Sequence, residues 1–304
     1  MRFKVWNEGV VRVRICLRRR SGAGPMAIAP SDSVFTTLPF DGVESALDPI
    51  WHFKRIRNHA SRLGISIPKE LLPLVIERLG DAVRCWRSDE VELGDTTSEN
   101  KLGKIRLQPP ALLQITVDCD GDVKLTIRTP ARLFDSLEAS AVTNPMPRFS
   151  RRITGTKHAA WQPYHDARKY AKSRGADVAL LIDDDIIVDA DRASPILLDS
   201  DGVAYFSRIE SGAVDSLTLR ALSDAVSDAG IPLRPARLTR TLVARCREFI
   251  VVGSGIGVAR IVEIDGQFVG GDEPTPLYRA LTESQDKRLE SGWISLREVV
   301  AWDT

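Results

Sequence analysis

The sequence predicts an α+β fold in two domains. The chain has 304 residues, a length typical of about two domains. Helical and strand-like apolar segments both occur, and in the second half short apolar runs are separated by brief turns. Runs this close together leave no room for crossover helices, so we expect mainly antiparallel strands. The pattern argues against a doubly wound parallel sheet.

Composition and charge exclude several classes of protein. Hydrophobic residues make up 43% and charged residues 27% of the chain, as in ordinary globular proteins with a full core. The net charge of +1 creates no field that would attract nucleic acid, and no apolar run reaches the length of a membrane-spanning helix. We therefore expect no nucleic-acid partner and no membrane partner.

The cysteines are scattered and form no C-x-x-C pair. This spacing argues against a disulfide framework and against a zinc site, and it fits the reducing cytoplasm. We expect all of them to be small buried side chains, and we expect no metal site. They are Cys16, Cys85, Cys119 and Cys246.

Two interpretations of the N-terminus stay open. Residues 1–20 are basic and lack the long apolar stretch of a secretory signal. Apolar and polar side chains alternate from Val11 to Arg18, as they do in a strand. Residues 1–25 are thus either an edge strand or an extension upstream of a true start at Met26.

The first half predicts one domain and a linker. In chain order we expect a β segment at 31–40, helices at 50–63 and 68–86, a polar loop at 87–103, and strands at 111–118 and 122–128. Gly64 and Pro68 are the stop and start signals of the two helices, and Asp120-Gly121 is a hairpin turn signal. Residues 130–152 hold three prolines and four arginines, which predicts an interdomain linker at 131–152. The predicted domains are residues 1–130 and 153–304.

The second half is rich in short apolar runs. We expect helices at 162–174, 216–229, 238–246 and 276–290, and strands at 178–182, 186–188, 195–198, 203–206, 248–252 and 258–264. Gly175 and Gly230 end two of these helices. The run Asp183-Asp184-Asp185 lies between two strands, where turn chemistry explains it better than a metal site does.

Three features could carry chemistry, and each also has an ordinary explanation. Lys157 is either a solvated surface charge or, if buried, an uncharged nucleophile toward an aldehyde. The glycine-rich loop 253–257 is either a plain β-turn or a phosphate cradle. It lacks the helix and the lysine of the nucleotide-binding fingerprints, so a nucleotide-binding protein is the least favoured interpretation. Arg62 is either a surface residue or a fork-like phosphate ligand.

The order of these features resembles that of the fold-type IV pyridoxal 5′-phosphate (PLP) enzymes, the class IV aminotransferase and 4-amino-4-deoxychorismate lyase family. The resemblance covers about residues 31–280. It implies a smaller N-terminal α/β domain, a larger C-terminal domain with mainly antiparallel strands and helices, and a homodimer. The matching segments are Asp32–Leu38, His59–Leu63, Thr156–His158, Gly175–Asp183, Ile187–Ser194, Ser216–Thr218, Val252–Val258 and Arg260–Gly266.

The resemblance implies a role for each matched site residue. Lys157 would hold PLP as a Schiff base and would move protons during catalysis. Asp189 would bond the protonated pyridine nitrogen, which makes the ring an electron sink. The phosphate would be bound by Arg62, Thr218, Ser254 and the backbone N–H groups of Gly255 and Ile256. Tyr164 is a further candidate that is equally well explained as a core aromatic of the helix 162–174.

Three positions depart from the family pattern. Asp189 replaces the usual glutamate and is one methylene shorter, Ser216 replaces a glycine, and Trp161 stands where many members carry arginine or tyrosine. The favoured function is a PLP-dependent aminotransferase acting on a small amino acid. The alternatives are a 4-amino-4-deoxychorismate lyase forming 4-aminobenzoate and pyruvate, and a PLP-fold binding protein without turnover. Thr156-Lys157-His158 and residues 191–194 lean toward the lyase-like branch.

Overall fold

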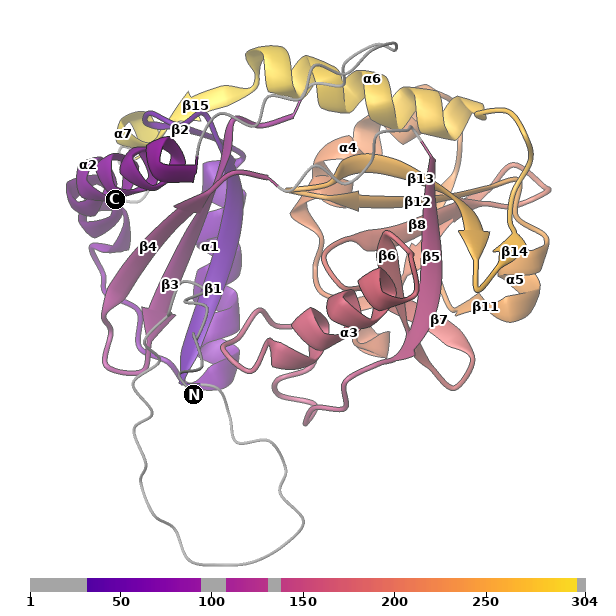
Figure 1. The fold of residues 1–304 in the computed structure, drawn as a ribbon, viewed down its shortest axis with the longest axis horizontal. Coiled ribbons are helices and arrows are strands. Elements are labelled where there is room, and N and C mark those ends of the chain that lie inside the picture. The colour runs from indigo at the N-terminus through magenta and orange to yellow at the C-terminus, as the bar shows by residue number, and fades with distance from the viewer. Residues whose placement is uncertain (1–31, 94–107, 131–137, 300–304) are drawn as a thin grey trace, which may run out of the picture.

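A computed structural model describes residues 32–93, 108–130 and 138–299 of the chain (Figure 1). The alternatives for residues 1–25 lie outside the described residues, as does the first part of the expected linker. The described chain forms two sheets with helices around them, which confirms the α+β prediction.

The smaller sheet is antiparallel throughout and has the strand order β15-β2-β1-β3-β4. Its β1, β3 and β4 confirm the predicted strands of the first half. Its outermost strand, β15, comes from the far end of the chain. The strands are β1 (Ser33–Phe40), β2 (Ser45–Leu47), β3 (Ala111–Asp118), β4 (Val123–Arg128) and β15 (Trp293–Ser295).

Helices α1 (Pro49–Leu63) and α2 (Leu71–Leu93) pack on the smaller sheet. Alternate residues of β1, including Val34 and Leu38, face these helices and are fully buried. Gly64 ends α1 with a φ of 75°, as its glycine signal predicts. The expected loop at 87–103 is wrong over residues 87–93, because α2 continues there. Five of those seven residues are polar, but none is proline or glycine, and polarity alone does not end a helix.

The larger sheet has the order β10-β9-β8-β12-β13-β5-β6-β7-β11, with β14 paired to β13. Most neighbours are antiparallel, as expected, whereas β5 runs parallel to β13 and β6, and β10 runs parallel to β9. The strands are β5 (Glu138–Pro145), β6 (Val178–Asp183), β7 (Ile186–Ala190), β8 (Ser194–Leu198), β9 (Ala204–Ser207), β10 (Leu233–Ala236), β11 (Leu238–Thr239), β12 (Glu248–Gly253), β13 (Gly257–Ile264) and β14 (Gln267–Phe268).

Two further expected segments differ from the structure. Strand β5 lies inside the expected linker 131–152, with Ala139 and Ala141 buried in the core of the larger sheet. Pro145 is its last residue, where a missing N–H does little harm to the ladder. The expected helix at 238–246 is shorter, because residues 238–239 form β11 and only α5 (Arg240–Ala244) is helical.

The larger sheet is buried on both faces along β12. Phe249 and Val251 belong to one core cluster, and Ile250 and Val252 belong to the other, which also contains side chains of α4 (Leu217–Asp228) and α6 (Pro276–Ser291). A continuous apolar run is the expected signature of such a strand. A third helix, α3 (Gln162–Ser173), packs on β5 and β6.

Helix α6 connects the two sheets. It crosses the top of the view in Figure 1 and leads to β15 of the smaller sheet, after which α7 (Leu296–Val299) packs near α1 and α2. Arg288 of α6 also forms an ion pair with Asp48, directly before α1. The end of the predicted second domain therefore contributes a strand to the smaller sheet.

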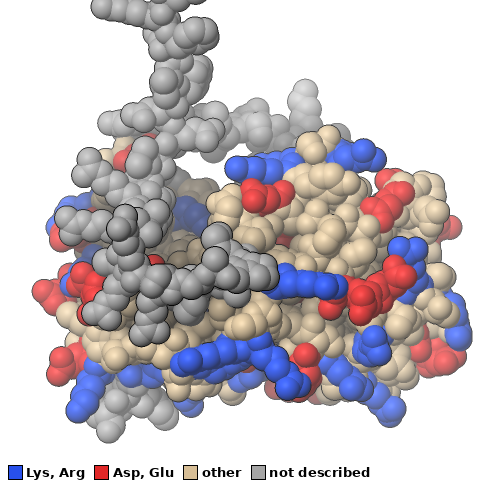
Figure 2. All heavy atoms as spheres, turned by 90° about the horizontal axis from the view of Figure 1, so that it is seen from below, with Lys and Arg blue, Asp and Glu red and all other residues tan. Residues whose placement is uncertain are grey.

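The surface carries both signs of charge. On the face shown in Figure 2, basic and acidic side chains are interspersed among uncharged residues. In the described part of the chain, no helix is long and apolar enough to cross a membrane. The cysteine prediction holds for buried Cys246 and is wrong for Cys85 and Cys119, which are exposed, whereas Cys16 lies outside the described residues.

Candidate active site

Lys157 lies where the two sheets meet. Its backbone carbonyl accepts a hydrogen bond from Phe35 of β1 at 3.1 Å, and His158 forms a β-bridge with Val34. Its backbone N–H donates to Nδ1 of His59 on α1 at 3.1 Å. These bonds fasten a residue of the second half of the chain to the strand and helix of the smaller sheet. The position of the Lys157 side chain is thus set by both halves.

The Lys157 amine lies in an aromatic corner formed by Phe35 and Trp161. Its Nζ is 4.8 Å from the centroid of the Trp161 ring and 5.3 Å from that of Phe35, and the two rings stand at 88°. Tyr164 stacks parallel to Trp161 with centroids 3.8 Å apart, so it covers the opposite face of that ring. Two ring faces therefore border the amine, which is a cation–π arrangement.

Burial, followed by the charges of Arg55 and Arg128, lowers the pKa of Lys157 to about 7, and the charge of Asp189 acts against this shift. An ammonium group loses hydration when it is buried, so its uncharged form gains. Near neutral pH a substantial share of Lys157 is therefore the free amine, which is the nucleophilic form.

Asp189 is the carboxylate whose charge acts on this amine. It lies on β7 and is only 3% exposed. Its Oδ1 accepts from the N–H of Ala190 at 2.9 Å, and its Oδ2 accepts from the N–H of Val214 at 3.0 Å. Burial raises the pKa of Asp189 to about 7, although both backbone bonds and Lys157 act against the shift. The carboxylate is thus held rigidly in an environment that disfavours its charge.

Tyr164 is close to this carboxylate. The side chain is 3% exposed, and burial, followed by the charge of Asp189, raises the pKa of its hydroxyl. Tyr164 is therefore a core aromatic on α3 that also neighbours the Lys157 site. Its position is compatible with both predicted roles, a core aromatic and a residue of the cofactor site.

Thr218 and Ser254 come together at the first turn of α4. The Thr218 Oγ1 and Ser254 Oγ atoms are 3.5 Å apart, although the residues are 36 positions apart in sequence. Ser216 caps α4 by accepting the N–H of Leu219 at 3.3 Å. Two hydroxyls beside a helix N-terminus form a polar group suited to an anion.

The glycine-rich loop closes the β12–β13 hairpin beside these hydroxyls. A Cβ on Gly253 would lie 2.7 Å from the carbonyl oxygen of Arg192, and a Cβ on Gly255 would lie 2.8 Å from the side chain of Leu112. The N–H of Ile256 donates to the carbonyl of Gly253 at 3.2 Å, so it closes the turn. The N–H of Ile256 is thus used within the β-turn. Of the two predicted backbone donors to a phosphate, the N–H of Gly255 is therefore the better candidate.

The structure does not bring Arg62 into this group of residues. Arg62 is exposed, and its Nη2 donates to the carbonyls of Thr154 at 2.7 Å and Arg151 at 3.3 Å. Arg55, two helical turns earlier on α1, is 6% exposed and acts electrostatically on Lys157. Its Nη1 donates to the carbonyl of Asp215 at 2.9 Å, directly before α4. Arg55, and not the predicted Arg62, therefore lies beside the start of α4.

A sequence signal for Arg55 was available. The pattern of histidine, two residues, arginine and an apolar residue occurs twice, as His52–Ile56 and His59–Leu63. The copies are seven residues apart and share nearly the same face of a helix. Periodicity cannot choose between them, because only the packing of α1 against residue 215 shows which arginine is buried.

The arrangement fits a cofactor with an anionic end and a basic ring nitrogen. Arg55, Thr218 and Ser254 gather at the start of α4, whereas Asp189 lies toward β7, and adjacent residues 214 and 215 bond to Asp189 and Arg55. The Nε of Arg55 is buried without a hydrogen-bond partner among the described residues. A buried cationic donor with unused hydrogens is suited to a phosphate.

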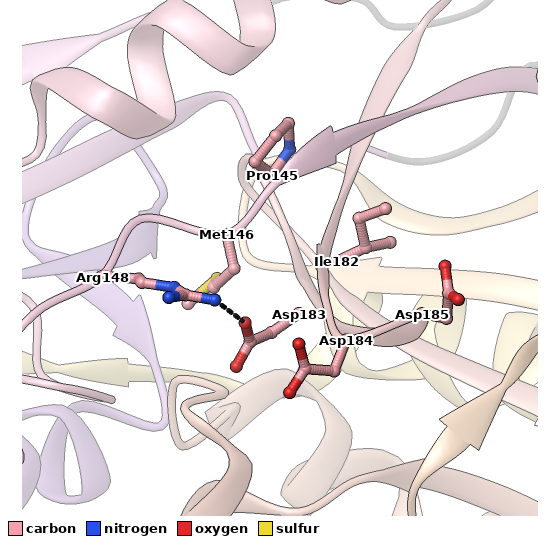
Figure 3. A pocket seen from close by; sticks show the side chains of 7 residues that line it. All are labelled: Pro145, Met146, Arg148, Ile182, Asp183, Asp184 and Asp185. Carbon is pink, nitrogen blue, oxygen red and sulfur yellow. Dashed lines mark hydrogen bonds and ion pairs between the residues drawn. The ribbon is translucent and has the colours of Figure 1, made fainter.

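The aspartate run forms a separate feature. Asp184 and Asp185 have φ angles of 48° and 61°, so they make the tight turn between β6 and β7 that the sequence predicts. Asp183 pairs with Arg148 at 3.3 Å (Figure 3), and Asp185 pairs with Arg240 at 2.9 Å. The three aspartates line the cavity drawn in Figure 3, and Lys157 is not among the residues that line it. Within the described ranges, no group of three His, Cys, Asp or Glu residues is placed to hold a metal.

Comparison with known proteins identifies the family. The model of amino-transferase class IV matches residues 33–264, so the chain belongs to the class IV aminotransferases, a PLP-dependent family. A search of curated proteins finds no match.

Solved structures share the fold at low identity. A branched-chain aminotransferase from Thermoproteus uzoniensis with norvaline has a TM-score of 0.67 and 16% identity, covering 88% of this chain and 91% of its own. A protein provisionally named 4-amino-4-deoxychorismate lyase has a TM-score of 0.63 and 23% identity, covering 87% and 96%. A hypothetical aminotransferase from Mycobacterium tuberculosis, in its PLP-bound form, has a TM-score of 0.63 and 17% identity, covering 90% and 96%.

Proposed function

We propose that this protein is a PLP-dependent aminotransferase that acts on a small amino acid and carries its cofactor on Lys157. The observation that supports this most directly is a lysine amine with a pKa of about 7 that lies in the aromatic corner and is influenced by the charge of Asp189. Burial supplies the uncharged amine that attack on an aldehyde requires. Membership of a PLP-dependent family supplies the aldehyde.

Each residue of the site has a role in this proposal. Arg55, Thr218, Ser254 and the N–H of Gly255 would hold the phosphate. Asp189, fixed by two backbone donors, would hold the proton of the ring nitrogen. Bound PLP supplies an electron sink for the substrate carbon. Lys157 then acts through Nζ as general base and acid at that carbon, which its near-neutral pKa suits.

A second candidate function uses the same residues. A 4-amino-4-deoxychorismate lyase would release pyruvate and 4-aminobenzoate instead of passing the amino group to a keto acid. The segment Thr156-Lys157-His158 favours this branch, and two of the solved structural neighbours carry that name provisionally. A silent PLP-binding protein is the third candidate, motivated by the shorter carboxylate at position 189.

The first test is an absorbance scan of wild type and Lys157→Ala after incubation with PLP and removal of the excess. A visible band in wild type alone supports the lysine assignment, whereas no band, or equal bands, refutes it. Lys172→Ala, an exposed lysine on α3, is the matched control and should keep the band. Amino transfer to a keto acid, pyruvate release from aminodeoxychorismate, or the absence of both then separates the three candidates.

We also propose a cytoplasmic homodimer, on the family resemblance alone. Light scattering of the purified protein should give twice the mass of one chain, and a monomer at micromolar concentration would refute the dimer. Cell fractionation tests the location.

A further inference from the structure

Arg55 lies at the end of a buried chain of side chains that the proposed chemistry leaves unassigned. Its Nη2 donates to Oγ1 of Thr36 on β1 at 3.0 Å, and that oxygen lies 2.8 Å from Nδ1 of His52 on α1. Thr36 and His52 are 0% and 1% exposed. Water therefore does not replace either bond when it is lost.

Donor and acceptor chemistry sets the direction of both bonds. A guanidinium only donates, so the Thr36 oxygen accepts from Arg55. The hydroxyl proton of Thr36 is then free to point to Nδ1 of His52, which accepts it when the ring proton is on Nε2. Burial lowers the pKa of His52 well below its usual value, and Arg55, Lys157 and Arg288 lower it further, so the ring is neutral and one of its nitrogens is an acceptor. Every polar atom between His52 and Arg55 is thereby matched.

The partners of Arg55 are uncharged. Its guanidinium bonds a hydroxyl and the carbonyl of Asp215, whereas the Asp215 carboxylate pairs with Arg220 at 3.0 Å. Among the described residues, no ion pair involves Arg55. Uncharged groups therefore set the orientation of the guanidinium.

We propose that Thr36 and His52 are positioning residues that orient the Arg55 guanidinium toward the phosphate of the cofactor. The role rests on the proposed function, because it assumes that Arg55 binds that phosphate. Thr36 sets the angle of the guanidinium through one bond, and His52 holds the hydroxyl of Thr36 in the rotamer that accepts.

The experiment compares the affinities of the apoprotein for PLP and for pyridoxal, which has the aldehyde but no phosphate. Thr36→Val keeps the shape of the side chain and removes the hydroxyl. We expect it to weaken PLP binding about tenfold, since a hydrogen bond to a charged group is lost. We expect pyridoxal binding to stay unchanged. Thr36→Ser should restore PLP binding, and His52→Asn, which offers an oxygen close to the place of Nδ1, should weaken it less than His52→Leu.

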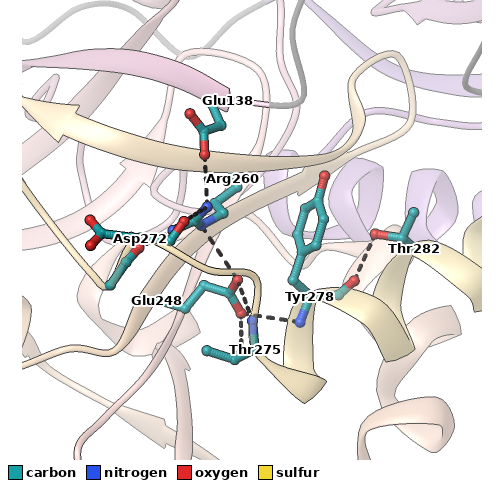
Figure 4. Close-up of polar contacts among 8 residues, drawn as sticks. Glu138, Glu248, Arg260, Asp272, Thr275, Tyr278 and Thr282 are labelled. Atoms are coloured by element: carbon teal, nitrogen blue, oxygen red, sulfur yellow. Dashed lines mark hydrogen bonds and ion pairs between the residues drawn. The ribbon is translucent and has the colours of Figure 1, made fainter. Parts of the chain in front are cut away.

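Thr275→Val is the matched control. Its buried hydroxyl bonds Glu248 at the opposite end of β12 from Ser254 (Figure 4). This variant should lose stability comparably and should bind PLP like wild type. Equal weakening of PLP and pyridoxal by Thr36→Val, or no change for PLP, would overturn the positioning role. Equal affinity of wild type for the two compounds would instead overturn the phosphate site itself, and with it the role of Thr36.

Discussion

Two buried carboxylates in the larger sheet have opposite surroundings. Glu248, fully buried on β12, accepts the N–H and hydroxyl of Thr275 and the N–H of Tyr278, and it lies 3.6 Å from the Nε of Arg260 (Figure 4). Arg260 also bonds Glu138 and the carbonyls of residues 271 and 272. This network ties the start of α6 to β12 and β13.

Asp189 is buried almost as deeply but has fewer partners. It receives two backbone N–H groups and faces Lys157 without a direct ion pair among the described residues. Burial raises the pKa of both carboxyls, to about 7 for Asp189. A buried carboxylate whose oxygens have several hydrogen-bond and ion-pair partners stabilises the fold. A buried carboxylate with fewer partners can still accept a hydrogen bond from a ligand.

The largest expected effect is on turnover, at the site of Lys157 and Asp189. Lys157→Ala should lower kcat by about 1000-fold or more, since the general acid–base group and the covalent nucleophile are both removed. Steady-state kinetics of the PLP-loaded enzyme measures this. Lys172→Ala should keep wild-type kcat, and a Lys157→Ala enzyme with wild-type kcat would contradict the site.

The network around Glu248 should have the largest effect on the free energy of unfolding. Glu248→Ala leaves Arg260 buried without one of its carboxylate partners and removes the cap of α6, so the free energy of unfolding should fall by about 3–5 kcal/mol. Denaturant titration of the apoprotein measures it. Unchanged stability would mean that the Glu248 network does not hold α6.

Asp189→Asn should affect activity more than stability, in contrast to Glu248→Ala. The folded pKa of Asp189, about 7, lies above its ordinary 3.8, so its contribution to stability falls as pH rises from about 4 to 7. At pH 8 the variant should therefore be as stable as wild type or more stable. Its kcat should still fall about 10- to 100-fold through loss of a charged hydrogen bond. A loss of stability as large as that of Glu248→Ala would remove the distinction.

The pH dependence of cofactor capture gives a further test. The pKa of Lys157 is lowered to about 7, so the share of free amine rises with pH up to that value and then levels off. The rate of visible band formation should increase about tenfold per pH unit below 7. Stopped-flow absorbance from pH 5 to 9 checks this, and a rate still rising above pH 9 would show an ordinary solvated lysine.

A smaller effect is expected at the loop between β12 and β13. Gly253→Ala places a Cβ 2.7 Å from the carbonyl oxygen of Arg192, a backbone atom that cannot easily move. The unfolding free energy should fall by about 1–3 kcal/mol from this overpacking. Gly271→Ala, whose nearest such contact is 3.7 Å, is the matched control. Equal stability of the two variants would show that the loop has room.

Much of the fold was predictable because local patterns suffice for it. The apolar runs of β1, β3, β6 and β12, the helix signals at Gly64 and Gly175 and the aspartate turn all appear where expected. Strand β5 escaped because its small residues and its proline resemble a linker, and its burial depends on β13 and β6, distant in sequence.

The class of the protein could be predicted from the sequence, since the order of short motifs around Lys157 and Asp189 identifies a family even when each motif is weak. The choice of the arginine at the site depends on how the helices and sheets pack. Arg55 and Arg62 have the same pattern on the same helix, and the packing of α1 against Asp215 buries one and leaves the other in solvent. The protonation state of Lys157 also depends on the tertiary structure. Its near-neutral pKa arises from burial between two sheets, a property of the folded chain that no local sequence pattern contains.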